Sequence, residues 1–380
     1  MAANTDVTQR LKDATALPLI VAPLFLNSVP ELVLASVKEG IVGSIPAFGQ
    51  YTTQGYDDWL TEIDTGIAKM KRDNPAAKIA PYAANLIFNN NARIDADLDV
   101  VIKHRVPIVM ASAEASREQI EKIHAYGGIV LHDVANLAEA KRAIDAGADG
   151  LIAITAGGGG QGSTMNPFVF VNELRRIFDG PIALAGGLAT GRDIAAAESI
   201  GADFAIMGTR FLATKESRAD PAYKQMIVDA TASDIIYTSA FTAQPANFLK
   251  DSITKEGFDA EKIRKEGTAA PRIVPAPGEK SKAWKHVWAA GQTVSHIHDI
   301  PSVAELAARL KNEYAAAKRE IAVKLGLVPA PAKTPKPPSK TASASMEYGK
   351  HDSIMSDRNF QKVGLWGHFW TKKTLIRGRK

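Results

Sequence analysis

Short apolar runs alternate with helical patterns over the first 210 residues of the chain, and each pair takes roughly 25 residues. Several of these runs are continuously apolar rather than alternating, which is typical of parallel strands buried on both faces. The predicted strands are Leu19–Phe25, Ile41–Phe48, Ile79–Ile87, Pro107–Ala113, Gly128–Asp133, Gly150–Thr155, Pro181–Gly186 and Phe204–Gly208.

Helical periodicity fills the segments between these strands. Glycine follows three of the helical patterns, at Gly40, Gly147 and Gly201, where a left-handed residue ends a helix at low cost. Eight strands with helical crossovers predict an α/β protein with a (β/α)8 TIM barrel, and an open doubly wound sheet is the alternative. The predicted helices are Pro30–Glu39, Ser116–Tyr126, Leu137–Ala146, Phe168–Phe178 and Thr190–Ile200.

The pattern changes after the eighth strand. Helical pieces such as Ala222–Ala230 and a loop rich in Pro and Gly (Gly267–Lys280) predict a helical cap over one end of the barrel. A long Ala- and Lys-rich helix then follows, and its Ser302 and Glu305 form a capping-box pattern. We therefore expect a barrel in residues 1–216, a helical cap in 217–300 and a closing helix of the barrel in 301–327.

Residues 328–380 differ in composition from the rest of the chain. Val328–Ser345 is dense in Pro, Ala, Ser, Thr and Lys, as is typical of a linker. Residues 364–380 combine Trp366 and Trp370 with five Lys and Arg side chains. From residue 331 onward there are 11 Lys and Arg against 3 Asp and Glu, whereas residues 1–330 hold 35 against 38. The overall charge of +5 therefore belongs to this extension, and it does not indicate a nucleic-acid-binding protein.

Several classes of protein are disfavoured by what the chain lacks. There is no cysteine for a disulfide, a thiolate metal site or a cysteine nucleophile. The eight histidines have no metal-binding spacing, and no zinc-protease, P-loop or paired-carboxylate motif is present, so we expect no metal. The chain has no secretory signal pattern at its start and no apolar run of about 18 residues, so we expect a cytoplasmic protein without a membrane span.

Two glycine-bearing loops follow the last two predicted strands. They contain Gly186 and Gly187 in the first loop, and Gly208 and Thr209 in the second. In a TIM barrel these loops commonly form a phosphate cradle, because glycine lets backbone N–H groups approach the anion. Two ordinary tight turns are the alternative. Arg210 would either add charge to this site or cap the barrel rim.

A longer glycine-rich loop, Thr155–Thr164, follows the sixth strand. Its run of glycines, which begins at Gly157, costs folding entropy and suits a planar ligand lying close to the backbone. A flexible surface loop is the alternative. The loop contains no acid or base, and its Ser163 and Thr164 have no evident neighbouring base.

Polar or rigid residues stand at three other strand ends. Pro23 ends the first strand with a fixed turn suited to a pocket wall. Asn85 ends the third strand and Asp133 the fifth, and each would either bind a ligand or cap a helix.

From about Leu17 to Ala316 the chain resembles the nitronate monooxygenase (2-nitropropane dioxygenase) family of FMN-dependent barrels. The resemblance is carried by Ala22-Pro23, Ala146–Gly150, Ala185–Gly187, Gly208–Phe211, Ser281–Trp284 and Ala290–Gln292. It implies FMN in the barrel domain, held by the residues of the loops described above, with the phosphate on the last two loops. The implied FMN contacts are Ala22, Pro23, Leu24, Ala156, Gly157, Gly186, Gly187, Gly208 and Thr209, joined by Asn85 and Asp133.

The chain departs from the family at the catalytic base. Relatives carry a histidine in the glycine-rich loop that removes a proton from a neutral nitroalkane, and Gln161 stands there in this chain. A segment of the cap related to Thr242–Leu249 also often carries a histidine, and Pro245 stands in its place. Glutamine cannot take up a proton near neutral pH, so we expect Gln161 to orient the substrate.

These residues leave three hypotheses about function. The first is an FMN-dependent monooxygenase that uses O2 to oxidise a nitronate or a similar pre-ionised small substrate, which needs no base. The second is a NAD(P)H-dependent quinone or enoyl-thioester reductase on the same flavin barrel. The third is a degenerate family member that acts as a binding protein through its tail. For the tail itself, docking onto the barrel or onto a neighbouring subunit is preferred over binding to an acidic partner, a membrane surface or a nucleic acid.

Overall fold

The computed structural model describes residues 2–88, 92–274 and 282–329. Residues 1–329 form one compact unit. The predictions for residues 330–380 lie outside the described residues, and so does the prediction for the end of the Gly267–Lys280 loop.

Eight parallel strands form the central sheet, in the order β1-β9-β8-β6-β5-β4-β3-β2. A parallel bridge between Ile20 and Val42 joins the first and last strands in this order, so the sheet closes into a barrel. The predicted TIM barrel is confirmed, and the open sheet is not. The strands are β1 (Leu19–Val21), β2 (Gly43–Pro46), β3 (Tyr82–Ile87), β4 (Ile108–Ser112), β5 (Ile129–Val134), β6 (Gly150–Ile154), β8 (Ile182–Ala185) and β9 (Phe204–Met207).

Side chains alternate between the barrel interior and the surrounding helices. In β5, Ile129 and Leu131 belong to the interior cluster, whereas Val130 packs in a cluster with residues of α4 and α5. Because successive side chains of a strand point to opposite faces, Asp133 continues the inward row and His132 points outward. The strand register therefore aims Asp133 at the barrel axis.

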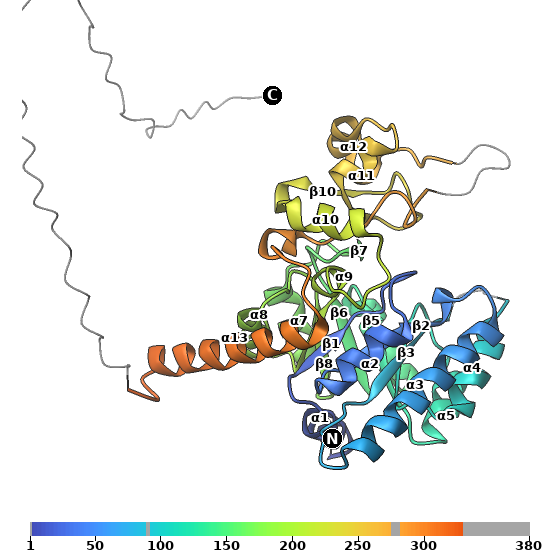
Figure 1. Ribbon diagram of the computed structural model, residues 1–380, viewed down its shortest axis with the longest axis vertical. Helices are drawn as coiled ribbons and strands as arrows, with labels where there is room; N and C mark the ends of the chain where they lie inside the picture. Colours follow the sequence, from blue (N-terminus) through green and yellow to red (C-terminus); the bar gives the residue numbers. More distant parts are fainter. Residues whose placement is uncertain (1, 89–91, 275–281, 330–380) are drawn as a thin grey trace, which may run out of the picture. The chain divides into compact units, whose positions relative to one another are not determined.

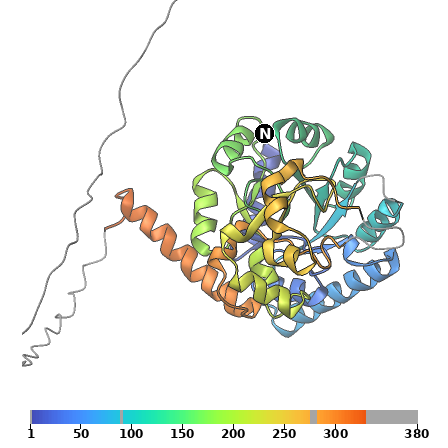
Figure 2. The ribbon, with the colours of Figure 1, turned by 90° about the horizontal axis from the view of Figure 1, so that it is seen from above.

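Helices surround the barrel, as the view along its axis shows (Figure 2). All five helices predicted between the strands are present, and Gly40, Gly147 and Gly201 have positive φ as expected. The sequence analysis named no helix at α3 or α4. The helices are α2 (Pro30–Lys38), α3 (Thr53–Asp73), α4 (Ile94–Lys103), α5 (Arg117–His124), α6 (Leu137–Ala146), α7 (Pro167–Arg175), α8 (Gly191–Ser199) and the short α9 (Thr209–Leu212), with a 3-10 turn η1 (Ala47–Gly49).

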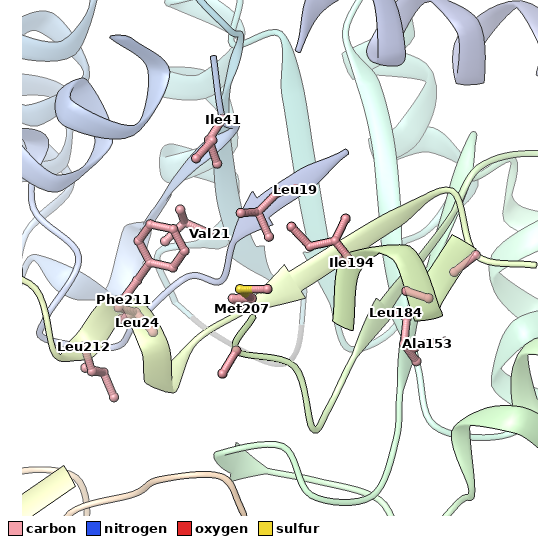
Figure 3. Close-up of a cluster of buried hydrophobic side chains, with 14 of the residues drawn as sticks. Leu19, Val21, Leu24, Ile41, Ala153, Leu184, Ile194, Met207, Phe211 and Leu212 are labelled. Carbon is pink, nitrogen blue, oxygen red and sulfur yellow. The ribbon is translucent and has the colours of Figure 1, made fainter. Parts of the chain in front are cut away.

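The largest apolar core lies between the strands and the outer helices. Leu19, Val21 and Met207 from β1 and β9 meet Ile194 of α8 and Phe211 of α9 there (Figure 3). Each of these side chains is almost fully buried. This packing fixes the end of β9, from which the second glycine loop begins.

A helix that the sequence analysis did not predict, α1 (Ala2–Ala14), covers the N-terminal end of the barrel (Figure 1). Its Val7 and Leu11 join the interior cluster with Ile20 and Ile108. Lys12 adds an ion pair with Asp203 at 2.9 Å. One end of the barrel is thereby closed with apolar side chains.

The cap over the opposite end contains the expected helix α10 (Pro221–Asp229) and also a small antiparallel sheet in the order β10-β11-β7 (Figure 1). Its third strand, β7 (Gly160–Gln161), comes from the glycine-rich loop of the barrel. The sequence analysis described the cap as helical, because strands this short and this far apart in sequence leave no local signal. The remaining cap elements are η2 (Ala232–Asp234), β10 (Ile235–Thr238), β11 (Ala246–Leu249), α11 (Lys250–Lys255), α12 (Ala260–Glu266), η3 (Gly267–Ala269) and η4 (Gln292–His296).

The predicted closing helix is α13 (Val303–Lys324), with the expected capping box between Ser302 and Glu305. It packs on α8, where a Cβ atom on Gly191 would lie 2.3 Å from the Leu310 carbonyl oxygen. Through this contact, α13 joins the ring of helices around the barrel after the chain leaves the cap. Within the described residues, no helix has the length and apolar character needed to cross a bilayer.

Candidate functional site

A cavity of about 530 Å³ lies where the carboxyl ends of the barrel strands meet the cap. Its floor includes Met110, Ile152 and Ile206 at the strand ends, and its cap side includes Tyr223 and Trp284. This is the position at which TIM barrels bind their ligands.

Eleven of the twelve predicted site residues line this one cavity, although they come from six strand ends and loops. They are Ala22, Pro23, Leu24, Asn85, Asp133, Gly157, Gln161, Gly186, Gly187, Gly208 and Thr209. Ala156 is not among the lining residues. Its N–H donates to the Met165 carbonyl oxygen at 2.9 Å, and its own carbonyl oxygen lies against Gly186.

The two phosphate-loop candidates are neighbours, because β8 and β9 pair in register through Ala185 and Ile206. Gly186 and Gly187 have φ values of +127° and +76°, which other residues rarely adopt. The backbone N–H groups of Gly187 and Thr209 donate to no other described residue. These groups can therefore donate to an anion in the cavity.

The N–H groups at the start of α8 are already hydrogen-bonded to other parts of the protein. The N–H groups of Ala189 and Thr190 donate to the Asp193 carboxylate at 2.9 and 2.8 Å. The N–H of Gly191 donates to Glu313 of α13 at 2.8 Å. An anion in the cavity would therefore be held by the loop before α8 and by the start of α9.

Arg210 caps the barrel rim, which was one of its two predicted roles. Its side chain is 2% exposed and does not line the cavity. Its guanidinium donates to the carbonyl oxygens of Ala213 and Asp299, both at 2.8 Å, and to Asp299 Oδ1 at 3.2 Å. This charge joins the end of β9 to the segment that leads into α13.

The glycine-rich loop packs tightly against the cap. The Gly157 carbonyl oxygen accepts a hydrogen bond from the Gln292 N–H at 2.9 Å. A Cβ atom on Gly159 would lie 2.8 Å from the Gly291 nitrogen, and one on Gly291 would lie 2.5 Å from the Gly157 oxygen. The absence of side chains at these glycines therefore lets the loop backbone contact the cap backbone. It also leaves space in the cavity.

The segments that hold Gln161 and Pro245 meet in the small sheet of the cap. Gln161 pairs with Ala246 of β11, and the Gly162 N–H donates to the Pro245 carbonyl oxygen at 3.3 Å. Gln161 is exposed and lines the cavity. The cap sheet thus places Gln161 close to Pro245, which is not itself among the residues that line the cavity.

The wall of the cavity is largely apolar. Phe25 and Phe48 line it from the loops after β1 and β2, and Trp284 and Leu212 line it as well. Trp284 has φ +67°, an unusual conformation for a bulky residue. Among the described residues that line the cavity there is no histidine, lysine or arginine, and no described group of three or more potential ligands could hold a metal ion.

One carboxyl, Asp133, lies in this apolar floor within a chain of polar groups. Asn85 Nδ2 donates to the Met110 carbonyl oxygen and to Ser112 Oγ, both at 3.0 Å. Ser112 in turn faces the Asp133 carboxyl and favours its ionised form. These polar side chains form a row across the ends of β3, β4 and β5.

Burial raises the pKa of the Asp133 carboxyl above its ordinary value, and the hydrogen bond from Ser112 and the proximity of His132 oppose this only in part. The side chain is 32% exposed, and that exposed area faces the cavity. Asp133 is therefore the group in the described lining whose protonation responds to what fills the cavity.

Several residues that line the cavity were not predicted from the sequence. Ser112 is the polar end of a predicted strand, like Asn85 and Asp133, and that position could have identified it. Trp284 stands in one of the segments that carry the family resemblance. Phe48, Tyr223 and Thr293 have no local signal, because only the tertiary fold brings them to the cavity.

The fold and the cavity together define a TIM barrel whose ligand site lies at the carboxyl ends of the strands under a cap. The sequence pattern of the nitronate monooxygenase family matches residues 9–313, and the chain belongs to this family of oxidoreductases.

The names of proteins similar to this chain specify different activities. The chain is 27% identical over 231 residues to a 5-hydroxy-7a-methyl-1-oxo-octahydro-1H-indene-4-carboxyl-CoA dehydrogenase of Rhodococcus jostii, covering 59% of this chain and 60% of that protein. The matches span 43% and 60% of the lengths of the first two curated relatives, which is about half.

Two solved structures share the fold over most of the chain. The nitroalkane oxidase of Streptomyces ansochromogenes is 25% identical with a TM-score of 0.68, covering 82% of this chain and 99% of that one. FabK of Thermotoga maritima is 26% identical with a TM-score of 0.66, covering 85% and 99%.

Proposed function

We propose that the protein is an FMN-dependent oxidoreductase that oxidises a nitronate or a similar small pre-ionised substrate with O2. The observation that carries this proposal is that ten of the eleven FMN contacts implied by the family resemblance line one cavity, together with Gln161. A bound flavin supplies the two-electron chemistry, and the protein binds and orients it.

The residues present fit a flavin with a phosphate group. The N–H groups of Gly187 and Thr209 supply donors for the phosphate, and the apolar side chains of Ile152 and Ile206 suit a planar ring. Ala22, Pro23 and Leu24 would hold the ring edge with their backbone groups, and Asn85 and Asp133 would lie against it. Ala156 would act through its contact with Gly186 rather than by touching the flavin.

The cap side of the cavity supports a substrate that has already lost its proton. Gln161 can donate a hydrogen bond to a nitronate oxygen but cannot remove a proton from carbon. No described residue that lines the cavity is a histidine that could take up this proton. The protein's contribution would be to exclude water and orient the substrate through Gln161 and the aromatic wall.

The absorbance spectrum of the purified protein, followed by titration with FMN, tests this proposal. We expect a flavin spectrum or saturable uptake of FMN, and then O2 consumption with a propyl nitronate but little with neutral nitropropane. A colourless protein that takes up no FMN would contradict the proposal and would favour a degenerate member acting as a binding protein.

A second candidate is a NAD(P)H-dependent reductase of a quinone or an enoyl thioester. The apolar cavity wall without a described cation favours an uncharged substrate over an anion. The name of the Rhodococcus jostii relative, which specifies a carboxyl-CoA substrate, adds to this. Anaerobic mixing with NADPH separates the two functions, because rapid bleaching of the flavin band supports the reductase and an unchanged band supports the oxidase.

A further inference from the structure

Asp133 is a carboxyl in surroundings that do not stabilise a negative charge. Its inward neighbours at the strand ends include Met110 and Ile152, and no lysine or arginine stands among the described lining residues. Transfer of a carboxylate from water into such a site is costly unless a cation or several donors compensate for it.

The groups that face Asp133 offer limited compensation. On its own strand, His132 donates from Nδ1 to the Asp133 backbone carbonyl oxygen at 2.7 Å and stands 4.0 Å from Oδ1. At the end of β4, the Ser112 hydroxyl and the Ala113 backbone favour the ionised carboxyl. From α6, Glu139 adds a negative charge that opposes ionisation. The balance of these groups raises the pKa of Asp133.

The polar chain behind Asp133 fixes the orientation of the carboxyl. Asn85 is 7% exposed, and its amide donates to Ser112 Oγ, so the Ser112 hydroxyl proton remains available for the carboxyl. The Asp133 carboxyl thus has Ser112 on one side, and its exposed part faces the cavity.

A ligand that fills the cavity changes this balance further. It displaces the water that reaches the exposed part of Asp133, and a phosphate-bearing ligand brings more negative charge into the same space. Both effects favour the neutral carboxylic acid, which has a proton to donate.

We propose that Asp133 binds the flavin ring as a neutral carboxylic acid, donating a hydrogen bond to an acceptor atom of the ring, so that flavin binding takes up one proton. This inference rests on the proposed function. The proton moves from solvent to an Asp133 carboxylate oxygen as the ligand enters, and no covalent bond of the ligand forms or breaks. Asn85 and Ser112 are positioning residues for this carboxyl.

Titration calorimetry with riboflavin tests the proposal, because riboflavin has the ring but no phosphate that would itself titrate. Binding is measured at pH 6, 7 and 8 in buffers of different ionisation enthalpy, which gives the number of protons taken up. For the full chain we expect uptake approaching one proton at pH 8 and an affinity that falls by up to about tenfold per pH unit. In D133N, whose amide donates a hydrogen bond at every pH, we expect no proton uptake and an affinity independent of pH.

A second variant covers the case in which D133N does not fold. Ser112→Ala removes a hydrogen bond that favours the ionised carboxyl, so we expect the ligand-free protein to hold the proton to higher pH. Proton uptake and the fall in riboflavin affinity should therefore both begin at a higher pH than in the unaltered chain. An unchanged pH dependence in S112A would contradict the proposal.

The outcomes separate this inference from the proposed function. Riboflavin and FMN binding without proton uptake in the unaltered chain, or equal uptake in D133N, would overturn the role of Asp133 and leave the flavin site intact. No binding of either compound by the unaltered chain would overturn the proposed function, and this inference with it.

Discussion

At the scale of single residues, the site depends on a few side chains and glycines. Their local conformation limits which contacts each of them can make. Gln161 lines the cavity from the glycine-rich loop, and Gly186 lies against the backbone at the start of that loop. Both positions can be altered without disturbing the buried strands, so each supports a direct test.

Replacing Gln161 with histidine should create activity on neutral nitroalkanes. A positioned general base contributes about 100-fold or more to proton removal, and the exposed end of β7 has room for an imidazole. We expect O2 consumption with neutral nitropropane to rise by about that factor, whereas turnover of the nitronate stays close to that of the unaltered chain. Gln161→Asn is the matched control, and no gain over it would count against the orienting role of Gln161.

The two adjacent glycines of the first loop should respond differently to alanine. A Cβ atom on Gly186 would lie 2.5 Å from Thr155 Oγ1, whereas one on Gly187 meets its nearest atom at 3.9 Å. We expect Gly186→Ala to cost about 3 kcal/mol of unfolding free energy through overpacking. Gly187→Ala should cost about 1 kcal/mol, through its left-handed φ alone.

Urea unfolding and FMN titration would measure both glycine variants. G186A should lose FMN affinity as well as stability, because the loop must move away from Thr155. Equal effects of the two substitutions would show that backbone conformation rather than close contact determines the loop.

At the scale of elements, ion pairs and close backbone contacts join segments far apart in sequence. Asp299 connects the end of the cap to Arg210 after β9 and to Arg309 of α13. The hydrogen bonds from Arg309 and the charge of Arg210 lower the pKa of Asp299, and burial opposes them in part. This junction fixes where α13 leaves the cap.

Asp299→Asn should therefore destabilise the protein in a pH-dependent way. A carboxyl with a lowered pKa stabilises the fold above its ordinary value of 3.8 and loses this contribution as the pH falls through the lowered value. Because Asp299 is partly exposed, we expect a loss of only about 1–2 kcal/mol at pH 7.

Chemical unfolding between pH 2.5 and 7 would measure this effect. The difference between D299N and the unaltered chain should shrink towards zero at the acid end. Asp229→Asn, at an exposed carboxylate on α10, is the control and should change stability little at any pH. A constant difference across the range would contradict the assigned ion pairs.

At the scale of the whole molecule, residues 1–329 form one unit, and the basic, aromatic extension begins after it. The match to the family ends at residue 313, before the extension. The body and the extension thus differ in composition and in family coverage, and they can be tested separately.

Deleting residues 330–380 should leave the barrel folded and able to bind flavin, because residues 1–329 form one unit and supply every described residue that lines the cavity. If the extension docks on the barrel or on a neighbouring subunit, as its tryptophans favour, the deletion should change the oligomer mass or the turnover. Light scattering and steady-state kinetics measure these two quantities. Unchanged mass and turnover would contradict docking.

The sequence by itself determined the barrel, because continuous apolar runs separated by amphipathic helices bury their surface best in a closed parallel sheet. It also identified the glycines at the strand ends, whose conformations follow from local geometry. It did not indicate the small sheet of the cap, since β7 and β11 pair across a long sequence separation.

Only the tertiary structure decided what the polar residues do. From the sequence, Arg210 was equally suited to the ligand site and to the barrel rim. Its hydrogen bonds to Asp299 show that it lies at the rim. Gln161 lies at the cavity close to Pro245 because β7 pairs with β11. The surroundings of Asp133 depend on side chains of β4 and α6 as well as its own strand, because burial and electrostatics are sums over neighbours in space rather than in sequence.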